Sequence, residues 1–276
     1  MACRCLDAML ILLLLLDPLA APGVAAAEAG CQVTRNVVYV ERSDEVLHAD
    51  IYQPDGEGPF PAVLCVHGGA WVVGSKNYVG VIAELLAHHG YTAVAVDYRL
   101  APRYRFPAQI EDCRQAVTWM RQHAEPYKID TDRLAAWGYS AGGHLVLLLG
   151  LEKAGLKAVV AGGAPCDFRE MPPDSLQLAF WLGGSRRQFP EVYRAASPAA
   201  MVSRDAPPIF FYHGEKDSLV RIDQPTAMVR FLKQAGANGE MYVVPQAGHV
   251  GAFLNRDALA AGVKFLDKHL KCEEVK

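Results

Sequence analysis

The sequence predicts an α/β fold built on a mostly parallel, doubly wound sheet with helices on both faces. Short apolar runs alternate along the chain with longer segments of helical periodicity. Parallel strands are buried on both faces and therefore read as continuous apolar runs, and a regular alternation of strands and helices favours a parallel sheet. The 276 residues, 51% of them hydrophobic, suffice for one domain with one large core.

Two outer strands come first, at residues 33–40 and 46–52, where apolar and polar residues alternate as in an antiparallel hairpin at a sheet edge. The buried strands are expected at residues 62–66, 92–96, 134–137, 159–162, 209–212 and 241–244. The helices are expected at residues 81–88, 110–121, 144–151, 226–234 and 258–270. In such sheets the ligand crevice lies beyond the carboxyl ends of the strands, so functional side chains are expected just after strands.

Residues 1–29 are expected to be a cleavable export signal. Arg4 precedes the apolar run 8–16, and small residues follow at 25–29, so that cleavage after Ala27 or Ala29 fits the small-x-small pattern. The apolar run is shorter than the ~20 residues that cross a bilayer, which favours cleavage over retained anchoring. The catalytic domain would then be residues 30–276, secreted or periplasmic, with no stable membrane span in the mature chain.

Charge and cysteine content limit the partners and the covalent links. The net charge of -3 and pI of about 6.3 give no basic footprint, so nucleic acid is not an expected partner. The mature chain would keep Cys31, Cys65, Cys113, Cys166 and Cys272, an odd number. A bridge between Cys31 and Cys272 is compatible with an oxidising compartment, but the sequence does not decide connectivity or oligomeric state.

The segment Gly138-Tyr139-Ser140-Ala141-Gly142 joins a predicted strand to a predicted helix. A serine between glycines at such a corner is typical of a nucleophile elbow, in which a strained turn lifts the hydroxyl clear of the sheet. An isolated match of this kind is as often an ordinary tight turn as a nucleophile elbow. Further motifs in the expected chain order, upstream and downstream, favour the nucleophile.

A serine nucleophile needs a base within hydrogen-bond reach and an anion that orients the base. His249 is the candidate base, because it follows the last predicted strand, whereas the other histidines lie near helix ends, on an outer strand or at turns. Asp217 is the candidate anion, and the order serine, aspartate, histidine is that of α/β-hydrolases. Asp205 and Asp223 are weaker alternatives, since Asp205 precedes its strand and Asp223 resembles a helix cap.

Attack on a carbonyl also needs donors for the developing negative charge. The backbone N–H of Ala141, at the start of the predicted helix, is one candidate. Gly68 or Gly69 supplies the other, because a glycine backbone can approach the substrate closely. His67 is expected to brace this loop rather than exchange protons with the substrate.

At these residues the chain resembles a compact serine esterase of the α/β-hydrolase superfamily, similar to the hormone-sensitive-lipase and bacterial feruloyl-esterase-like branches. The shared motifs are residues 67–71, 97–102, 106–108, 138–143 and 213–217. The resemblance implies hydrolysis of small to medium acyl esters through an acyl-enzyme, with no metal and no cofactor. It also implies that Tyr98, Arg99 and Asp112 stabilise the loops around the oxyanion site.

Two departures from the pattern favour a member without a large N-terminal cap. Ala70 stands where a third glycine is usual, and only short strands precede His67. The segment 166–204 contains several apolar side chains that could line an acyl or aromatic pocket or simply cover the sheet. Trp71, Phe180 and Trp181 are the residues expected to contact the substrate.

Three other functions compete with the esterase. A prolyl-oligopeptidase-like serine peptidase is disfavoured, because there is no room for a propeller domain and Ala141 stands where those enzymes carry an aromatic residue. A non-catalytic binding module is disfavoured, because both nucleophile and base are present. An arylformamidase-like amidase shares the His-Gly-Gly loop and uses the same chemical groups, so it stays open.

Overall fold

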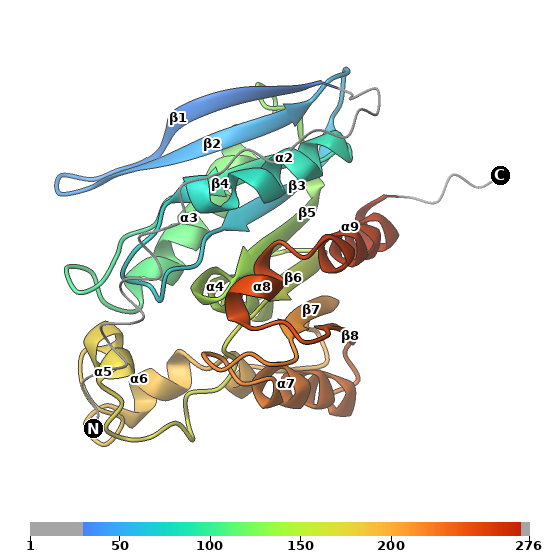
Figure 1. Cartoon of the computed structure of the whole chain (residues 1–276). Helices are drawn as coiled ribbons and strands as arrows, with labels where there is room; N and C mark the ends of the chain where they lie inside the picture. The colour runs from blue at the N-terminus through green and yellow to red at the C-terminus, as the bar shows by residue number, and fades with distance from the viewer. Residues whose placement is uncertain (1–29, 272–276) are drawn as a thin grey trace.

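Residues 30–271, which the computed structural model describes, form an α/β structure around one eight-stranded sheet (Figure 1). The strand order is β1-β2-β4-β3-β5-β6-β7-β8. β2 pairs antiparallel with both β1 and β4, and all the other pairs are parallel, which confirms the predicted sheet. The strands are β1 Cys31–Glu41, β2 Val46–Pro54, β3 Phe60–Val66, β4 Thr92–Val96, β5 Ile129–Tyr139, β6 Ala158–Gly162, β7 Ile209–Gly214 and β8 Gly239–Val244.

Each predicted helix is present, with its ends shifted by a few residues. These are α2 Gly80–His88, α3 Ala108–Gln122, α4 Ala141–Leu151, α7 Asp223–Gln234 and α9 Arg256–Leu270. Several short helices were not predicted, namely α5 Leu176–Leu182, α6 Pro190–Ala195, α8 His249–Phe253 and the 3₁₀ turns η1 Lys76–Val79 and η2 Pro198–Ala200. Across the described residues, no helix combines the length and the apolar composition needed to cross a bilayer.

The core consists of two apolar layers, one on each face of the sheet. Along β3, Leu64 and Val66 point into one layer, and Val63 and Cys65 point into the other, as the two-residue period of a strand requires. Buried side chains of α3 and α4 fill the first layer, and those of α2 and α9 fill the second. Helices therefore cover both faces, and the carboxyl ends of the parallel strands are left to loops.

The segment between β6 and β7 carries α5, α6 and η2, which lie together at the end of the molecule away from the β1–β2 hairpin (Figure 1). Phe168, Leu178 and Trp181 are buried in the first core layer, whereas Leu176 and Phe180 are exposed. The segment thus covers the sheet with one set of its apolar side chains and exposes another set to solvent. Before β3, the described residues form only β1 and β2 with their turns, without a helical cap.

Two expectations concern residues outside the described range. The export signal was assigned to residues 1–29, and the bridge was to join Cys31 to Cys272. Within the described range, Cys65, Cys113 and Cys166 are buried, and burial raises the pKa of each thiol. These three cysteines act as small core residues.

Candidate active site

Ser140 lies at the sharp turn between β5 and α4, in a backbone conformation that most residues avoid. Its φ is 54° and its ψ is -119°. The turn is held because the Ser140 N–H donates to the carbonyl of Gly162 on β6 at 2.8 Å. It also requires glycine at position 142, where a Cβ would lie 2.0 Å from the carbonyl oxygen of Val66. Glycine at this position lets α4 pack against the end of β3 while Ser140 stays partly exposed.

His249 and Asp217 complete a line of hydrogen bonds that begins at Ser140. His249 Nδ1 lies 2.6 Å from Asp217 Oδ2, and His249 Nε2 lies 2.9 Å from Ser140 Oγ. Because a carboxylate can only accept, the Nδ1 nitrogen carries the proton and Nε2 is left to accept from the serine hydroxyl. The structure therefore brings together three side chains from loops after β5, β7 and β8, in the tautomer that a general base needs.

Asp217 is a buried carboxylate with a complete set of donors. Its Oδ1 accepts from the N–H groups of Leu219 and Val220, each at 2.9 Å. Its Oδ2 lies 3.2 Å from Nε2 of the buried His213, in addition to the contact with His249. Burial alone would raise the pKa of Asp217, but the hydrogen bonds from His213 and His249 hold that pKa well below its usual range. The group is therefore an anion across the neutral pH range.

Sequence reasoning missed His213, which it treated as the opening of a turn. His213 Nε2 lies 2.8 Å from the carbonyl of Val220 as well as 3.2 Å from Asp217 Oδ2. One N–H shared between these two acceptors fixes the loop 217–220 on the end of β7. The sequence signal was a histidine four residues before the aspartate, next to the strand expected at residues 209–212; in the structure His213 lies within β7.

The loop that follows β3 forms the other side of Ser140. A Cβ at Gly68 would lie 3.3 Å from the Ser140 Cβ, so Gly68 borders Ser140. At Gly69 φ is 119°, and a Cβ would lie 1.9 Å from the carbonyl oxygen of Val73, so this position also demands glycine. Ala141 is the first residue of α4, and its N–H has no acceptor within the helix. Backbone amides thus lie on both sides of the serine.

His67 is a fully buried neutral side chain behind this loop. Its ring stacks on Tyr98 with 4.2 Å between centroids, and the Tyr98 hydroxyl donates to the His67 carbonyl at 3.0 Å. His67 Nδ1 contacts the Gly68 carbonyl oxygen at 2.6 Å. Burial lowers the pKa of His67 to about 4. The ring is therefore uncharged near neutral pH, and its contacts stabilise the loop after β3.

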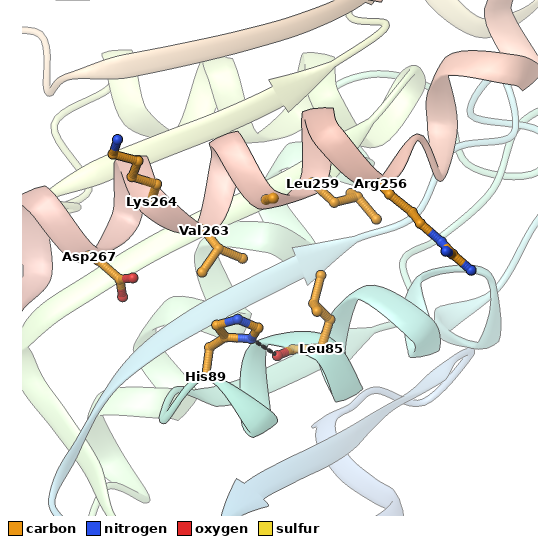
Figure 2. A pocket seen from close by; sticks show the side chains of 8 residues that line it. Leu85, His89, Arg256, Leu259, Val263, Lys264 and Asp267 are labelled. Carbon is orange, nitrogen blue, oxygen red and sulfur yellow. Dashed lines mark hydrogen bonds between the residues drawn. The ribbon is translucent and has the colours of Figure 1, made fainter. Parts of the chain in front are cut away.

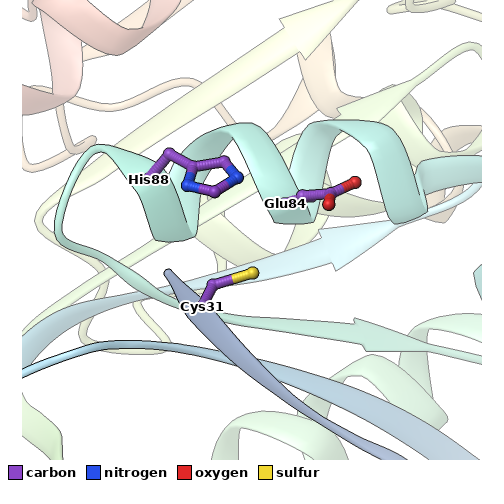
Figure 3. Close-up of side chains that lie close together, drawn as sticks. All are labelled: Cys31, Glu84 and His88. Atoms are coloured by element: carbon purple, nitrogen blue, oxygen red, sulfur yellow. The ribbon is translucent and has the colours of Figure 1, made fainter. Parts of the chain in front are cut away.

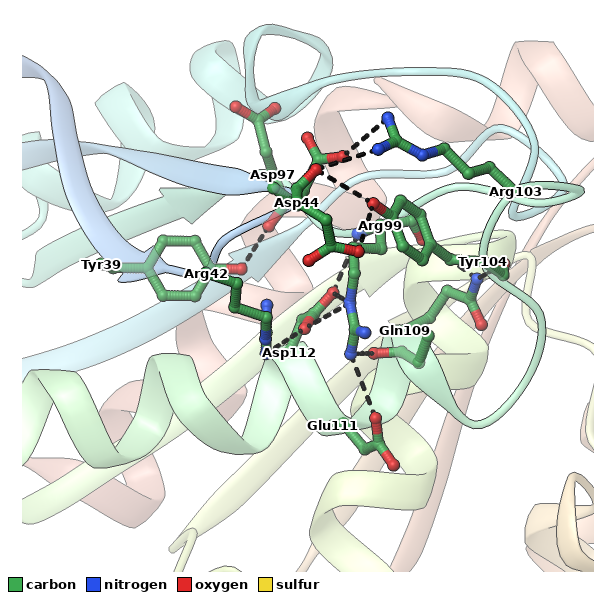
Figure 4. A network of polar contacts seen from close by, with 12 residues as sticks. Tyr39, Arg42, Asp44, Asp97, Arg99, Arg103, Tyr104, Gln109, Glu111 and Asp112 are labelled. Carbon is green, nitrogen blue, oxygen red and sulfur yellow. Dashed lines mark hydrogen bonds and ion pairs between the residues drawn. The ribbon is translucent and has the colours of Figure 1, made fainter.

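A polar network around Asp112 supports the loop from residue 97 to residue 107 (Figure 4). The buried Asp112 carboxylate accepts from Arg42 at 2.9 Å and from both the backbone and the side chain of Arg99 at 2.9 Å. The Gln109 amide donates to the Arg99 carbonyl at 3.0 Å. The same loop also contacts the loop after β3, because the Ala101 N–H donates to the Trp71 carbonyl at 2.9 Å.

Two of the three residues predicted to contact the substrate are core residues instead. Trp71 and Trp181 stack face to face with 3.8 Å between ring centroids, and their exposed fractions are 4% and 0%. Trp181 is fixed further by donation from Nε1 to Gln109 Oε1 at 3.0 Å. Each indole therefore covers the other rather than a ligand. Phe180 keeps an exposed fraction of 49%, so a ligand can reach it without rearrangement.

The two alternative aspartates lie away from His249. Asp205 pairs with Lys153 at 2.8 Å on the surface, and Asp223 pairs with Arg221 at 3.0 Å in the first turn of α7. Asp223 is thus the first helical residue and not the predicted cap, since α7 is preceded by Ile222 at the cap position. Neither carboxylate is positioned to orient the base.

A hollow of about 360 Å³ lies between α2 and α9 (Figure 2). Its lining contains none of the predicted catalytic or oxyanion residues. The lining residues are Leu85, His89, Arg256, Leu259, Ala260, Val263, Lys264 and Asp267. This hollow is therefore separate from the groups gathered around Ser140.

A family model and several relatives match this chain. The model of the BD-FAE family matches residues 49–232, which is 184 of the 276 residues and includes Ser140 and Asp217. The chain belongs to the BD-FAE family. His249 lies beyond the part of this BD-FAE protein that the model covers.

The relatives carry esterase names. Esterase LipC of Mycobacterium tuberculosis is 32% identical over 237 residues, which are 78% of this chain and 59% of LipC. The ethyl acetate hydrolase of Pseudomonas putida is 28% identical, over 83% of this chain and 80% of that enzyme. The chain thus spans about three fifths of LipC. Among solved structures, a truncated carbohydrate esterase from gut microbiota superposes with a TM-score of 0.82 at 24% identity, covering 90% of this chain and 99% of that one, which shows a shared fold.

Proposed function

We propose that this BD-FAE protein is a serine carboxylesterase that hydrolyses small to medium acyl esters through an acyl-enzyme on Ser140. The observation that carries the proposal is the line of hydrogen bonds from Asp217 through His249 to the Ser140 hydroxyl. The esterase names of the relatives support the same reaction class. An amidase would use the same groups, so only a panel of ester and amide substrates separates the two activities.

Acylation begins when the Ser140 hydroxyl attacks the ester carbonyl carbon and His249 Nε2 takes its proton. The imidazolium that forms is stabilised by Asp217, which lies 2.6 Å from Nδ1 and stays ionised. The carbonyl oxygen becomes an oxyanion, and the amides of Ala141 and of Gly68 or Gly69 donate to it. The carbon–oxygen bond to the alcohol then breaks, and His249 returns its proton to the leaving alkoxide.

Deacylation repeats these steps with water as the nucleophile. His249 removes a proton from water, which attacks the acyl carbon, and the same amides hold the second oxyanion. The bond to Ser140 breaks, the serine recovers its proton from His249, and the carboxylic acid leaves. Base assistance of this type contributes about 10² to 10⁴-fold to the rate.

The test combines a substrate panel with a covalent probe. We expect the mature protein to hydrolyse p-nitrophenyl acetate, butyrate or octanoate, with methyl ferulate and N-formylkynurenine as further substrates. Ser140→Ala should abolish turnover, and Ser43→Ala, in the exposed turn between β1 and β2, should retain it. A fluorophosphonate should label the protein once, and peptide mass spectrometry should place the label on Ser140.

The outcomes separate the alternatives. Ester turnover that survives Ser140→Ala, or a label on another residue, would overturn the assignment of the nucleophile. Cleavage of N-formylkynurenine without ester cleavage would replace the esterase by an arylformamidase-like amidase that uses the same serine. Labelling of Ser140 without turnover would indicate a reactive serine whose acyl group is not in the panel, whereas neither labelling nor turnover would favour a binding role.

We further propose that the protein is exported after removal of residues 1–29. The basis is the basic, apolar and small-residue pattern of that segment. N-terminal sequencing of the protein from a native host should give a chain that begins after Ala27 or Ala29. A chain that retains Met1 would contradict export by cleavage.

A further inference from the structure

Cys31, Glu84 and His88 form a cluster of three different donor atoms that the ester chemistry does not use (Figure 3). The sulfur, the carboxylate oxygen and the imidazole nitrogen all lie within 4.8 Å of one another. Glu84 and His88 are one turn apart on α2, so their side chains lie on the same face of the helix. Cys31 is the first residue of β1 and points toward that face (Figure 3).

We propose that Cys31, Glu84 and His88 form a surface site for a divalent transition metal, of which Zn²⁺ is the physiological candidate. Thiolate, imidazole and carboxylate are the donor types that zinc uses. A thiolate donor selects against Mg²⁺ and Ca²⁺, which prefer oxygen ligands. Small side-chain rotations would bring donors at this separation to the ~2.0 to 2.3 Å that zinc bonds require. Three protein ligands leave the fourth position to water.

The electrostatic surroundings also favour a cation. The negative charges of Glu84 and Asp55 act on Cys31, and they attract a divalent cation to the same point. On binding, the metal forms a bond to sulfur and the thiol proton is released to water. Glu84 and His88 are exposed, so the metal can enter directly from solvent.

The position of the cluster indicates a structural role. His88 ends α2 shortly before β4 begins, so it lies at the edge of the sheet where the parallel strands start. β1 runs in the same direction as β4, because both pair antiparallel with β2, and Cys31 therefore starts at that edge as well. Ser140 and His249 follow the ends of their strands, at the opposite edge. A metal at the cluster would fasten the outermost strand to α2 without touching the candidate active site.

Cobalt substitution tests the site directly on the mature full-length chain, kept reduced with a phosphine reductant. We expect one equivalent of Co²⁺ to bind, with a thiolate-to-cobalt charge-transfer band, and excess Zn²⁺ to displace it. Cys31→Ser should abolish the band, and His88→Gln should weaken binding by at least about tenfold, the scale of loss seen even for residues that only support ligands. His89→Gln is the matched control, since this exposed histidine contacts the Leu85 carbonyl and belongs to the α2–α9 hollow.

A second measurement concerns stability and the competing disulfide. Zn²⁺ should raise the Tm of the wild type and of Cys272→Ser, and leave the Tm of Cys31→Ser unchanged. The proposal is overturned if no thiolate band forms, or if the band persists in Cys31→Ser. It is equally overturned if peptide mapping of unreduced protein finds Cys31 in a bridge with Cys272. Ester turnover should be the same with and without metal, so a failed metal site and a failed esterase are separate results.

Discussion

Acid should destabilise this protein through His67 and His144, two fully buried histidines whose pKa burial lowers. Burial lowers the pKa of each to about 4, against about 6.5 in an unfolded chain. His144 Nε2 contacts the Ala196 carbonyl at 2.7 Å, whereas Nδ1 has no hydrogen-bond partner within residues 30–271. Protonation would therefore place a charge on a nitrogen that nothing there solvates.

The sign and size of the effect follow from these pKa values. Between pH 6.5 and 4 the unfolded chain binds more protons than the folded one, so the free energy of unfolding falls as the pH falls. For a pKa shift from about 6.5 to about 4, each histidine lowers the free energy of unfolding at pH 5 by about 2 kcal/mol, or by about 4 kcal/mol for the pair. That is a large share of the ~5 to 15 kcal/mol typical of a folded domain.

Urea unfolding followed by tryptophan fluorescence at pH 7 and pH 5 measures this loss. His144→Gln removes one titrating ring and keeps an N–H donor. Its free energy of unfolding should therefore fall between pH 7 and pH 5 by about 2 kcal/mol less than that of the wild type. The exposed His89→Gln should lose as much as the wild type. If His144→Gln also loses as much as the wild type, burial of this ring is not what makes the protein acid-sensitive.

Three further substitutions test the site and its supports. His213→Asn should lower kcat by roughly 10-fold to 100-fold with little change in KM, because misplacement of the anion misorients the base; an unchanged kcat would make this histidine merely structural. Gly142→Ala should cost more than about 4 kcal/mol or prevent folding, since its Cβ would meet backbone oxygen at 2.0 Å. Gly251→Ala, whose Cβ would sit 3.7 Å from a side chain, should fold normally, and equal stability of the two variants would refute the packing argument. Asp112→Asn should cost about 3 kcal/mol because it removes the buried carboxylate that pairs with both Arg42 and Arg99, whereas the exposed Asp205→Asn should cost less than about 1 kcal/mol in the same urea assay.

The regular part of the fold was readable from the sequence because strands buried on both faces leave apolar runs. The beginning of β5 was missed, since residues 129–133 are mostly polar and lie partly in solvent. The helices α5, α6 and α8 have five to seven residues, too few for a 3.6-residue period to stand out. α8 in particular starts at His249 in a glycine-rich motif that looked like a loop.

The site was predictable where chain order carries the information. Ser140, Asp217 and His249 follow strands in a fixed order, and parallel strands bring their carboxyl ends to one edge. Trp71 and Trp181 were misassigned because their stacking joins residues 110 positions apart, which no local pattern reveals. The additional donor His213 was missed because its partner is defined by the turn geometry of the loop after β7.

The segment between β6 and β7 is attached to its surroundings by backbone atoms near its two ends and by the buried Trp181 between them. His144, one turn beyond Ser140, contacts the Ala196 carbonyl, and Gln224 Oε1 accepts from the N–H groups of Cys166 and Asp167. The exposed side chains of Leu176 and Phe180 take no part in these attachments. Evolution or a protein engineer could therefore exchange these two residues, while the Trp71–Trp181 stack and the turn at Ser140 stay as they are.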